Sequence, residues 1–183
     1  MDVSVAICTW NRSDLLEQTL EQMRALVVPP GLSWELIVIN NNCSDRTDDV
    51  IASFVGKLPI RGISETNPGH SHARNRAVAE ARGDLILWTD DDVLVDSLWM
   101  SEHVAASRLH RDAGFYAGLI EPWFECDPPH WMSRHLRELS GVIVCVDHGT
   151  DMRPLKLDEG IFGANLAVRR DLALKYPFPQ YSQ

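Results

Sequence analysis

Residues 85–92 read Leu85-Ile86-Leu87-Trp88-Thr89-Asp90-Asp91-Asp92, an apolar run that ends in three aspartates. A short, continuous apolar run is typical of a strand buried on both faces of a parallel sheet. Because adjacent carboxylates repel one another, the end of this strand needs a compensating cation. Their oxygen atoms suit Mg²⁺ or Mn²⁺. The alternative is a solvated acidic turn before a helix that begins near Asp96.

Earlier segments alternate between strand and helix patterns. Residues 3–8 and 35–40 are predicted to be buried strands, and residues 59–65 a shorter third strand. Apolar side chains at Leu16, Leu20, Met23 and Val27 predict the first helix. A second helix is expected to contain Val50, Ile51, Phe54 and Val55, and a third to run from about residue 71 to 82. This alternation predicts an α/β fold whose central, mostly parallel sheet is flanked by helices.

The carboxyl ends of these strands are the expected place for a ligand. In doubly wound sheets the binding crevice opens where the strand order reverses, commonly between the first and fourth strands. That rule brings the residues after the first strand, Thr9 to Arg12, beside Asp90 to Asp92 in one cleft. Asn40 to Asn42 and Asn67 to Arg74 are predicted to line the same edge.

The second part of the chain has a less regular pattern. A helix is expected from Asp96 to about residue 110, and a fifth strand at residues 114–120. A loop rich in proline and aromatic residues follows, with Trp123 and Trp131 as surface for a ligand or as ordinary loop packing. Further predictions are a helix through Leu136 and Leu139, a strand at residues 141–146, an apolar segment at 161–168 and a short helix at 169–175.

Composition limits the class of protein. The chain has 183 residues, which predicts a single domain, and a net charge of −9 without a basic run, which argues against a nucleic-acid partner. Four cysteines without a C-x-x-C pair disfavour a zinc site and predict a reducing compartment. No segment is long and apolar enough to span a bilayer. A cytoplasmic location is therefore predicted, and work at the inner face of a membrane is left open.

Four segments of the sequence, residues 3–12, 37–47, 67–75 and 83–92, together form a recognisable family pattern. Together they resemble the family 2 glycosyltransferases, inverting enzymes with the Rossmann-like GT-A fold. Three later blocks, at residues 118–123, 129–131 and 163–170, are similar to a bacterial branch of that family. The resemblance implies one GT-A domain over residues 1–183. Its donor half at 1–112 ends in the Asp-x-Asp region, and a partial acceptor half follows at 113–183.

The resemblance implies transfer of a sugar, with inversion, from a nucleoside diphosphate sugar to a hydroxyl acceptor. The implied acceptor is a glycan, a lipid-linked sugar or a small molecule. The implied setting is the synthesis of cell-envelope or exopolysaccharide glycans. Asp90 and Asp92 are the implied ligands of Mg²⁺ or Mn²⁺. Peripheral membrane association and a homodimer are left open, as are the sugar and the nucleobase.

The resemblance also assigns roles to individual residues. Family members usually have an aspartate at the position of Asn40, where it accepts a nucleobase N–H; asparagine can still accept there and can also donate. Arg74 resembles the diphosphate-facing arginine, with a surface salt bridge as the alternative, whereas His70 and His72 are interpreted as loop residues. The implied nucleotide-sugar ligands are Thr9, Asn11, Arg12, Asn40, Asn42, Arg74, Asp90 and Asp91, and the implied acceptor-side residues are Trp123, Trp131 and Asn165.

The general base is not identified. The family usually places it in a Glu-Asp pair after the segment that matches Gly163-Ala164-Asn165, and no such pair follows here. The resemblance therefore implies a truncated chain whose base lies beyond Gln183. Asp158 and Glu159 are secondary candidates that precede that segment. Two other classes remain: a non-catalytic nucleotide-sugar-binding module, and a sugar nucleotidyltransferase, which would need a Gly-rich, Lys-containing loop after the first strand.

Overall fold

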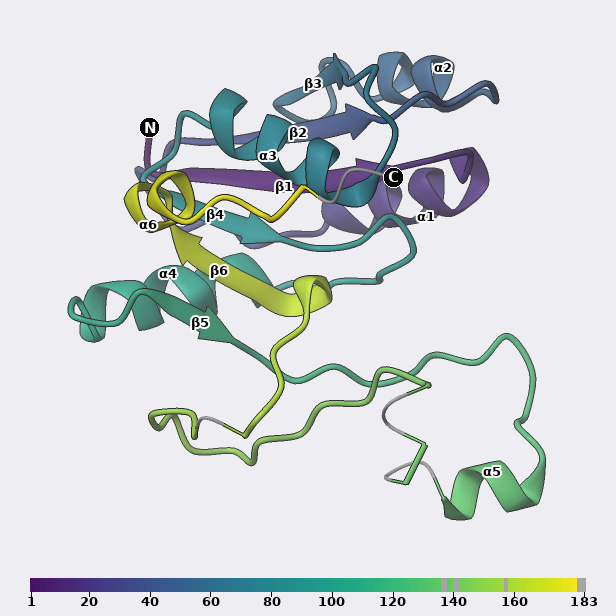
Figure 1. Cartoon of the computed structure of the whole chain (residues 1–183), viewed down its shortest axis with the longest axis vertical. Helices are drawn as coiled ribbons and strands as arrows, with labels where there is room; N and C mark the ends of the chain where they lie inside the picture. Colours follow the sequence, from purple (N-terminus) through teal and green to yellow (C-terminus); the bar gives the residue numbers. More distant parts are fainter. Residues whose placement is uncertain (136–137, 140–141, 157, 181–183) are drawn as a thin grey trace.

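The computed structural model describes residues 1–135, 138–139, 142–156 and 158–180. The strands are β1 (Val3–Thr9), β2 (Trp34–Asn40), β3 (Ile60–Ser64), β4 (Leu85–Trp88), β5 (Phe115–Ala117) and β6 (Leu166–Arg169). The helices are α1 (Ser13–Met23), α2 (Thr47–Ser53), α3 (His70–Glu80), α4 (Trp99–Leu109), α5 (His130–Arg134) and α6 (Arg170–Lys175), with a 3₁₀-helix at Gly163–Asn165. Figure 1 shows their arrangement.

The six strands form one sheet in the order β3-β2-β1-β4-β6-β5. The strand β1 lies between β2 and β4 and is parallel to both, so that Val3 pairs with Trp34 on one side and with Leu85 on the other. Val5, Ala6 and Ile7 are completely buried, because both faces of this strand are covered. The mostly parallel central sheet that the apolar runs predict is confirmed, and so is the neighbouring position of β1 and β4.

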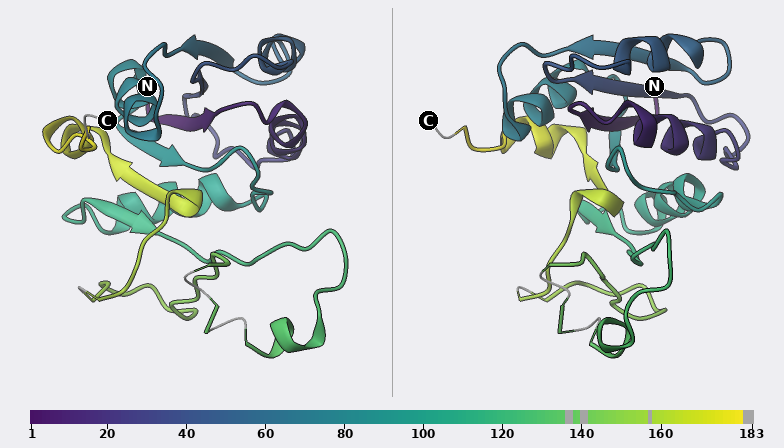
Figure 2. Two further views of the ribbon diagram at one scale, coloured as in Figure 1. Left: turned by 45° about the vertical axis from the view of Figure 1, so that its right-hand side comes forward. Right: turned by 90° about the vertical axis from the view of Figure 1, so that its right-hand side faces the viewer.

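Helices cover both faces of the sheet (Figures 1 and 2). On one face, α1, α2 and α4 pack on side chains of β1, β2 and β4 in a cluster that includes Leu20, Leu87 and Met100. On the other face, α3 and α6 pack on a second cluster that includes Ile86 and Trp88. The alternation of side chains along β4 therefore divides Leu87 and Ile86 between the two cores.

The last two strands of the chain, β5 and β6, make the antiparallel part of the sheet. The strand β6 is antiparallel to β4, with Trp88 opposite Leu166, and it is also antiparallel to β5, with Ala117 opposite Leu166. Between β5 and the 3₁₀-helix, the chain leaves the sheet and extends away from it (Figure 2). We call residues 118–162 the excursion. Its described residues contain the helix α5 and a single bridge between Ile120 and Val146.

Several predicted elements need correction. The described residues 142–146 form no strand, because only Val146 bridges to another segment. The predicted helix through Leu136 and Leu139 reduces to α5, with Leu139 in a turn; Leu136 and Gly141 lie outside the described residues. The first helix ends at Met23, which leaves Val27 beyond it and half-exposed. The apolar segment at 161–168 contains a strand, β6, that the sequence pattern did not predict.

No helix among the described residues combines the length and the apolar character that crossing a membrane requires.

Candidate functional site

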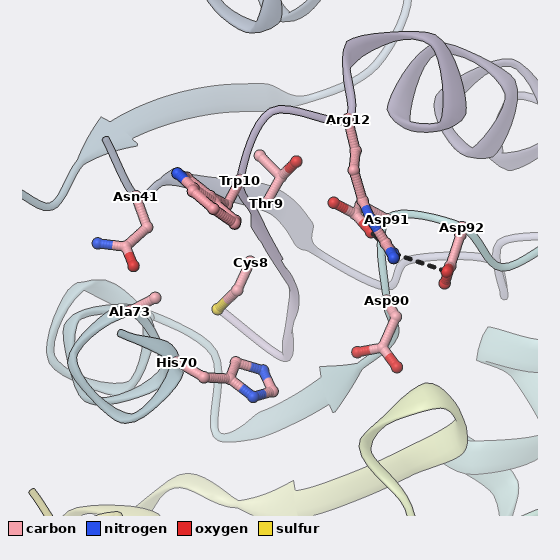
Figure 3. Close-up of a pocket in the computed structure, with 10 residues that line it drawn as sticks. All are labelled: Cys8, Thr9, Trp10, Arg12, Asn41, His70, Ala73, Asp90, Asp91 and Asp92. Carbon is pink, nitrogen blue, oxygen red and sulfur yellow. Dashed lines mark hydrogen bonds and ion pairs between the residues drawn. The ribbon is translucent and has the colours of Figure 1, made fainter. Parts of the chain in front are cut away.

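A cleft of about 320 Å³ opens where β1 and β4 end side by side (Figure 3). The loop after β1 forms one wall, the aspartate triplet after β4 forms another, and the first turn of α3 faces both. The sequence rule for doubly wound sheets therefore places the cleft correctly. Its lining residues are Cys8, Thr9, Trp10, Arg12, Asn41, His70, Ala73, Asp90, Asp91 and Asp92.

The loop between β1 and α1 brings Thr9, Trp10 and Arg12 to the cleft. Asn11 makes this possible by adopting a left-handed backbone conformation, with φ of 53°, which asparagine tolerates better than most residues. Its side-chain oxygen accepts a hydrogen bond from the Ser44 amide at 2.7 Å. Asn11 therefore ties this loop to the loop after β2, and it is absent from the cleft lining.

Arg12 supplies positive charge to two of the three aspartates of the triplet. Its Nη1 donates to Asp92 Oδ2 at 2.8 Å and to Asp91 Oδ1 at 3.2 Å, as Figure 3 shows for this cluster. Asp91 is only 5% exposed, and its hydrogen bond with Arg12 is the main reason that the pKa of Arg12 is raised. Arg12 thus provides part of the compensation that the sequence argument assigned to a metal ion, and it leaves Asp90 without an ion pair to this arginine. Asp91 thus orients Arg12.

Asp90 has a different environment from its two neighbours. Arg12 does not reach it, and its carboxylate points toward the His70 ring across the floor of the cleft (Figure 3). Burial raises the pKa of Asp90, Arg74 opposes this change, and Asp92 adds to it. Burial also lowers the pKa of His70 and raises that of Cys8 to about 12. Burial thus opposes the charged form of each of these three side chains, and a cation that enters the cleft would favour the ionised form of Asp90.

The carboxylates of Asp90 and Asp92 can be compared with the ligands that a metal ion needs. Among the described residues, no group of three or more His, Cys, Asp or Glu side chains could hold a metal ion by itself. Mg²⁺ usually takes one or two carboxylates and completes its coordination with water and substrate phosphates. Asp90 is free of the Arg12 ion pair, and Asp92 is 41% exposed at its side chain. These two residues fit a metal ion that is shared with a phosphate ligand.

The three consecutive asparagines at the end of β2 have separate roles. Asn40 accepts a hydrogen bond from the Cys43 amide and donates one to Asp48, each at 2.7–2.8 Å, so its amide is used within the loop. Asn41 lines the cleft and holds the segment before α3 through Glu65, Asn67 and Gly69. Asn42 donates to the Thr66 carbonyl at 3.0 Å. Neither Asn40 nor Asn42 belongs to the cleft lining.

Arg74 lies one helical turn beyond His70 in α3 and is absent from the cleft lining. Its guanidinium carbon is 5.9 Å from the centre of the Trp88 ring and 5.2 Å from that of Phe178. None of the ion pairs among the described residues includes Arg74. Its charge nevertheless acts on Asp90, His70 and Cys8. The structure therefore provides no partner for the surface salt bridge that was the alternative for this residue.

The predicted acceptor-side residues lie apart from the cleft lining. Trp123 and Trp131 belong to the excursion and are 67% and 59% exposed. Asn165 forms a half-buried junction: its side-chain oxygen is 2.9 Å from Trp99 Nε1 and 2.8 Å from His103 Nε2, while its amide donates to the Leu119 carbonyl. Asn165 thus fastens the start of the excursion to α4.

The two secondary candidates for a general base also lie in the excursion. Glu159 accepts hydrogen bonds from both terminal nitrogens of Arg153, at 2.8 and 2.6 Å. The Arg153 hydrogen bond lowers the pKa of Glu159 to about 2, which makes this carboxylate a poor proton acceptor. Asp158 is exposed to solvent. Neither residue lines the cleft.

Sequence reasoning omitted several lining residues from its list of ligands: Cys8, Trp10, Asn41, His70 and Ala73. Four of them, Trp10, Asn41, His70 and Ala73, nevertheless fall within the ranges 9–12, 40–42 and 67–74, which the strand-end argument placed at this edge. His70 was interpreted as a loop residue, since no metal-ligand spacing accompanies it. It is instead the first residue of α3, and the turn at Gly69 directs it toward Asp90 (Figure 3).

Known proteins resemble this chain in sequence and in fold. A family model described as glycosyl transferase family 2 matches residues 4–170. The probable glycosyltransferase YdaM of Bacillus subtilis is 38% identical over 95 residues, which are 49% of this chain and 22% of that protein. The succinoglycan biosynthesis protein ExoM of Rhizobium meliloti is 24% identical over 135 residues, 72% of this chain and 43% of that protein. The chain thus spans less than half the length of these relatives.

A solved structure shows the same fold. The mannosyltransferase PcManGT from Pyrobaculum calidifontis, in complex with GDP-Man and Mn²⁺, superposes with a TM-score of 0.70 at 20% identity. The match covers 97% of this chain and 47% of that protein. Together with the family match, this likeness confirms the GT-A architecture that the four sequence blocks implied.

Proposed function

Because this chain belongs to glycosyl transferase family 2, we propose that its cleft binds a nucleoside diphosphate sugar whose sugar is transferred to a hydroxyl acceptor. One observation carries the proposal: Asp90 and Asp92 lie opposite Thr9 and Arg12 in a single cleft at the carboxyl ends of β4 and β1. Open α/β sheets bind nucleotides at such a switch point. The GDP-Man and Mn²⁺ in the mannosyltransferase structure support the same class of ligand.

We assign Asp90 and Asp92 as the ligands of Mg²⁺ or Mn²⁺. When bound, such an ion neutralises the negative charge that develops on a departing diphosphate. Arg12 holds Asp92 at the cleft and limits the repulsion within the triplet. Arg74 offers a guanidinium to the phosphates from below. Asn11, Asn40 and Asn42 act through the shape of the loops that they stabilise.

Transfer with inversion needs one further group. An acceptor oxygen forms a bond to the anomeric carbon on the face opposite the diphosphate, the bond from that carbon to the phosphate oxygen breaks, and a base takes the acceptor proton. Among the described lining residues, the only carboxylates are those of the triplet. This observation favours a second candidate function, a nucleotide-sugar-binding module without transfer activity of its own.

The acceptor class remains a prediction. The name of ExoM, a succinoglycan biosynthesis protein, supports an acceptor in exopolysaccharide or cell-envelope synthesis. The exposed Trp123 and Trp131 of the excursion support a sugar or lipid-linked acceptor, because flat apolar rings can stack on such groups. Membrane association and a homodimer also remain predictions.

Calorimetric titration tests the donor proposal. UDP-, GDP-, ADP- and dTDP-sugars are titrated with Mn²⁺ and again with EDTA, and one of them is expected to bind only with the metal. Removing the Asp92 carboxylate in Asp92→Ala should weaken that binding at least about tenfold, because a metal ligand is lost. The exposed Asp112→Ala is the matched control. Equal affinity with Mn²⁺ and with EDTA would contradict the metal assignment.

Release of nucleoside diphosphate in the presence of a panel of hydroxyl acceptors separates the two candidate functions. Turnover would identify a transferase, whereas metal-dependent donor binding without turnover would identify a binding module. If turnover occurs, Asp158→Asn and Glu159→Gln should leave its rate unchanged, because neither residue lines the cleft and Glu159 is paired with Arg153. A rate that falls in either variant would place the general base in the excursion.

A further inference from the structure

The surroundings of Arg74 come from three distant parts of the chain. Two aromatic rings and one backbone segment surround its guanidinium. Trp88 is the last residue of β4, Phe178 follows α6 in the chain, and Gly163 is the first residue of the 3₁₀-helix. A Cβ atom at position 163 would collide with the guanidinium of Arg74. The two rings are nearly perpendicular, with an interplanar angle of 80° and centroids 5.8 Å apart. The guanidinium is thus confined between two aromatic rings and a glycine.

A pair of hydrogen bonds holds the backbone of Phe178 at the position from which its ring contacts Arg74. The side-chain amide of Asn75 donates to the Phe178 carbonyl at 2.9 Å, and its side-chain oxygen accepts from the Phe178 amide at 2.9 Å. Asn75 therefore binds the backbone of Phe178 as a neighbouring strand would. Because Asn75 follows Arg74 directly in α3, the residue that holds the ring is adjacent to the residue that the ring touches.

This environment holds the charge of Arg74 without neutralising it. Both ring centres lie within the range of about 6 Å at which a guanidinium is attracted to an aromatic face. A carboxylate partner would compete with a phosphate for the same N–H donors, but the ion pairs of the described residues include none for Arg74. The fork of donors is therefore oriented and still available to an oxyanion.

We propose that Phe178 and Asn75 are positioning residues that hold the Arg74 guanidinium for the diphosphate of the nucleotide sugar. The inference rests on the proposed function and names a part of the donor site that lies about one hundred residues after α3 in the sequence. The segment after α6 thereby contributes to donor recognition although Phe178 is absent from the cleft lining. This segment should affect how tightly the diphosphate group binds and should leave the binding of the nucleoside unchanged.

The test compares a nucleoside diphosphate with the matching monophosphate, UDP with UMP and GDP with GMP, by calorimetry in Mn²⁺. Phe178→Leu keeps an apolar side chain but removes the ring face. We expect its preference for diphosphate over monophosphate to fall about 3- to 10-fold, as the loss of a cation–π contact predicts, with monophosphate affinity unchanged. Phe178→Tyr should retain the preference. Tyr176→Leu, which removes an exposed aromatic side chain from the same segment, is the matched control.

A double-mutant cycle separates positioning from a general loss of structure. Arg74→Lys alone should reduce the diphosphate preference, because an ammonium cannot offer a planar pair of donors. In the Arg74→Lys background, Phe178→Leu should then have little further effect, since both changes act through one guanidinium. Additive losses in the cycle would overturn the proposal. If Phe178→Leu does not fold, Asn75→Ala, which keeps the ring and removes both hydrogen bonds, takes its place.

The other outcomes are equally decisive. An unchanged or increased diphosphate preference in Phe178→Leu would overturn the inference, and an increase would mean that the rings withhold Arg74 from the phosphates. If the wild-type chain binds a diphosphate but Arg74→Lys has no effect, this inference fails while the donor proposal survives. If the wild-type chain binds no nucleoside diphosphate with Mn²⁺, the proposed function itself fails.

Discussion

The sheet and the excursion differ in how strongly burial specifies them. In the sheet, Val5 and Ile7 are completely buried, because helices cover both faces. In the excursion, Trp123, Trp131 and Val142 are 67%, 59% and 85% exposed. Apolar side chains therefore determine the structure of the first region, whereas in the second most of them face solvent. An apolar residue specifies a fold only when another layer covers it.

The same difference separates the two halves of the proposed function. The donor cleft lies on the ends of β1 and β4, which the core holds in register. The residues assigned to the acceptor lie on the excursion, whose described part has little regular structure. Sites on strands and helices hold their geometry more precisely than sites on loops. We therefore expect donor binding to survive changes in the excursion.

The largest effect on stability is expected in the core of the sheet. Leu87→Ala removes a completely buried side chain of β4 and should lower the free energy of unfolding by about 2–5 kcal/mol. Urea unfolding followed by circular dichroism measures this change. A loss below about 1 kcal/mol would mean that the site collapses around the smaller side chain, and the contrast with the excursion would weaken.

An intermediate effect is expected at the loop that supports the cleft. Asp45 caps both neighbouring helices: it accepts hydrogen bonds from the Ser13 amide at the start of α1 and from the Thr47 amide at the start of α2. Asp45→Ala should therefore lower the free energy of unfolding by about 1 kcal/mol at pH 7. Asp48→Ala is not a suitable control because Asp48 binds Asn40; the exposed Asp112→Ala is preferable.

The effect of Asp45 should depend on pH. Burial alone would raise its pKa, but the hydrogen bonds with Thr47 and Ser13 lower it to about 2, against 3.8 for an unperturbed aspartate. The folded state therefore prefers the ionised carboxylate, and this part of the stability is complete above the unfolded pKa. It should disappear as the pH falls from about 4 to about 2. Unfolding curves that keep the full difference between wild type and Asp45→Ala at pH 2 would contradict this assignment.

The smallest effect is expected in the excursion. Trp131→Ala removes a large but mostly exposed side chain of α5 and should change the free energy of unfolding by no more than about 0.5 kcal/mol. Donor affinity in Mn²⁺ should also stay the same. A loss comparable to that of Leu87→Ala would show that Trp131 has a buried partner in solution, and the distinction between the two regions would no longer hold.

Much of the sheet could be predicted because its signals are local. The apolar runs at residues 3–8, 35–40 and 85–88 correspond to β1, β2 and β4, and the polar residues after them meet at one edge. From these strands, topology alone places Arg12 beside the aspartate triplet. The bond between Arg12 and Asp91 was not predicted, since a chain of like charges gives no indication of which cation neutralises it.

The remaining features depend on contacts that are distant in sequence. The strand β6 was not predicted because its neighbours, β4 and β5, lie far from it in the chain and no hairpin turn announces the pairing. The surroundings of Arg74 require Phe178, about one hundred residues later. Asn40 and Asn165 have the polar character of ligands, but internal hydrogen bonds occupy both side chains.

The antiparallel pairing of β5 with β6 has a consequence for how this protein can diverge. Ala117 and Leu166 face each other across the ladder, and the amide of Gly118 donates to the Asn165 carbonyl. The excursion therefore leaves and re-enters the sheet at adjacent points. Once the ends of a loop are joined in this way, doubling its length costs only about 0.6 kcal/mol. Evolution can lengthen, shorten or replace this segment and leave the donor cleft intact, which would let one nucleotide-binding scaffold serve many acceptors.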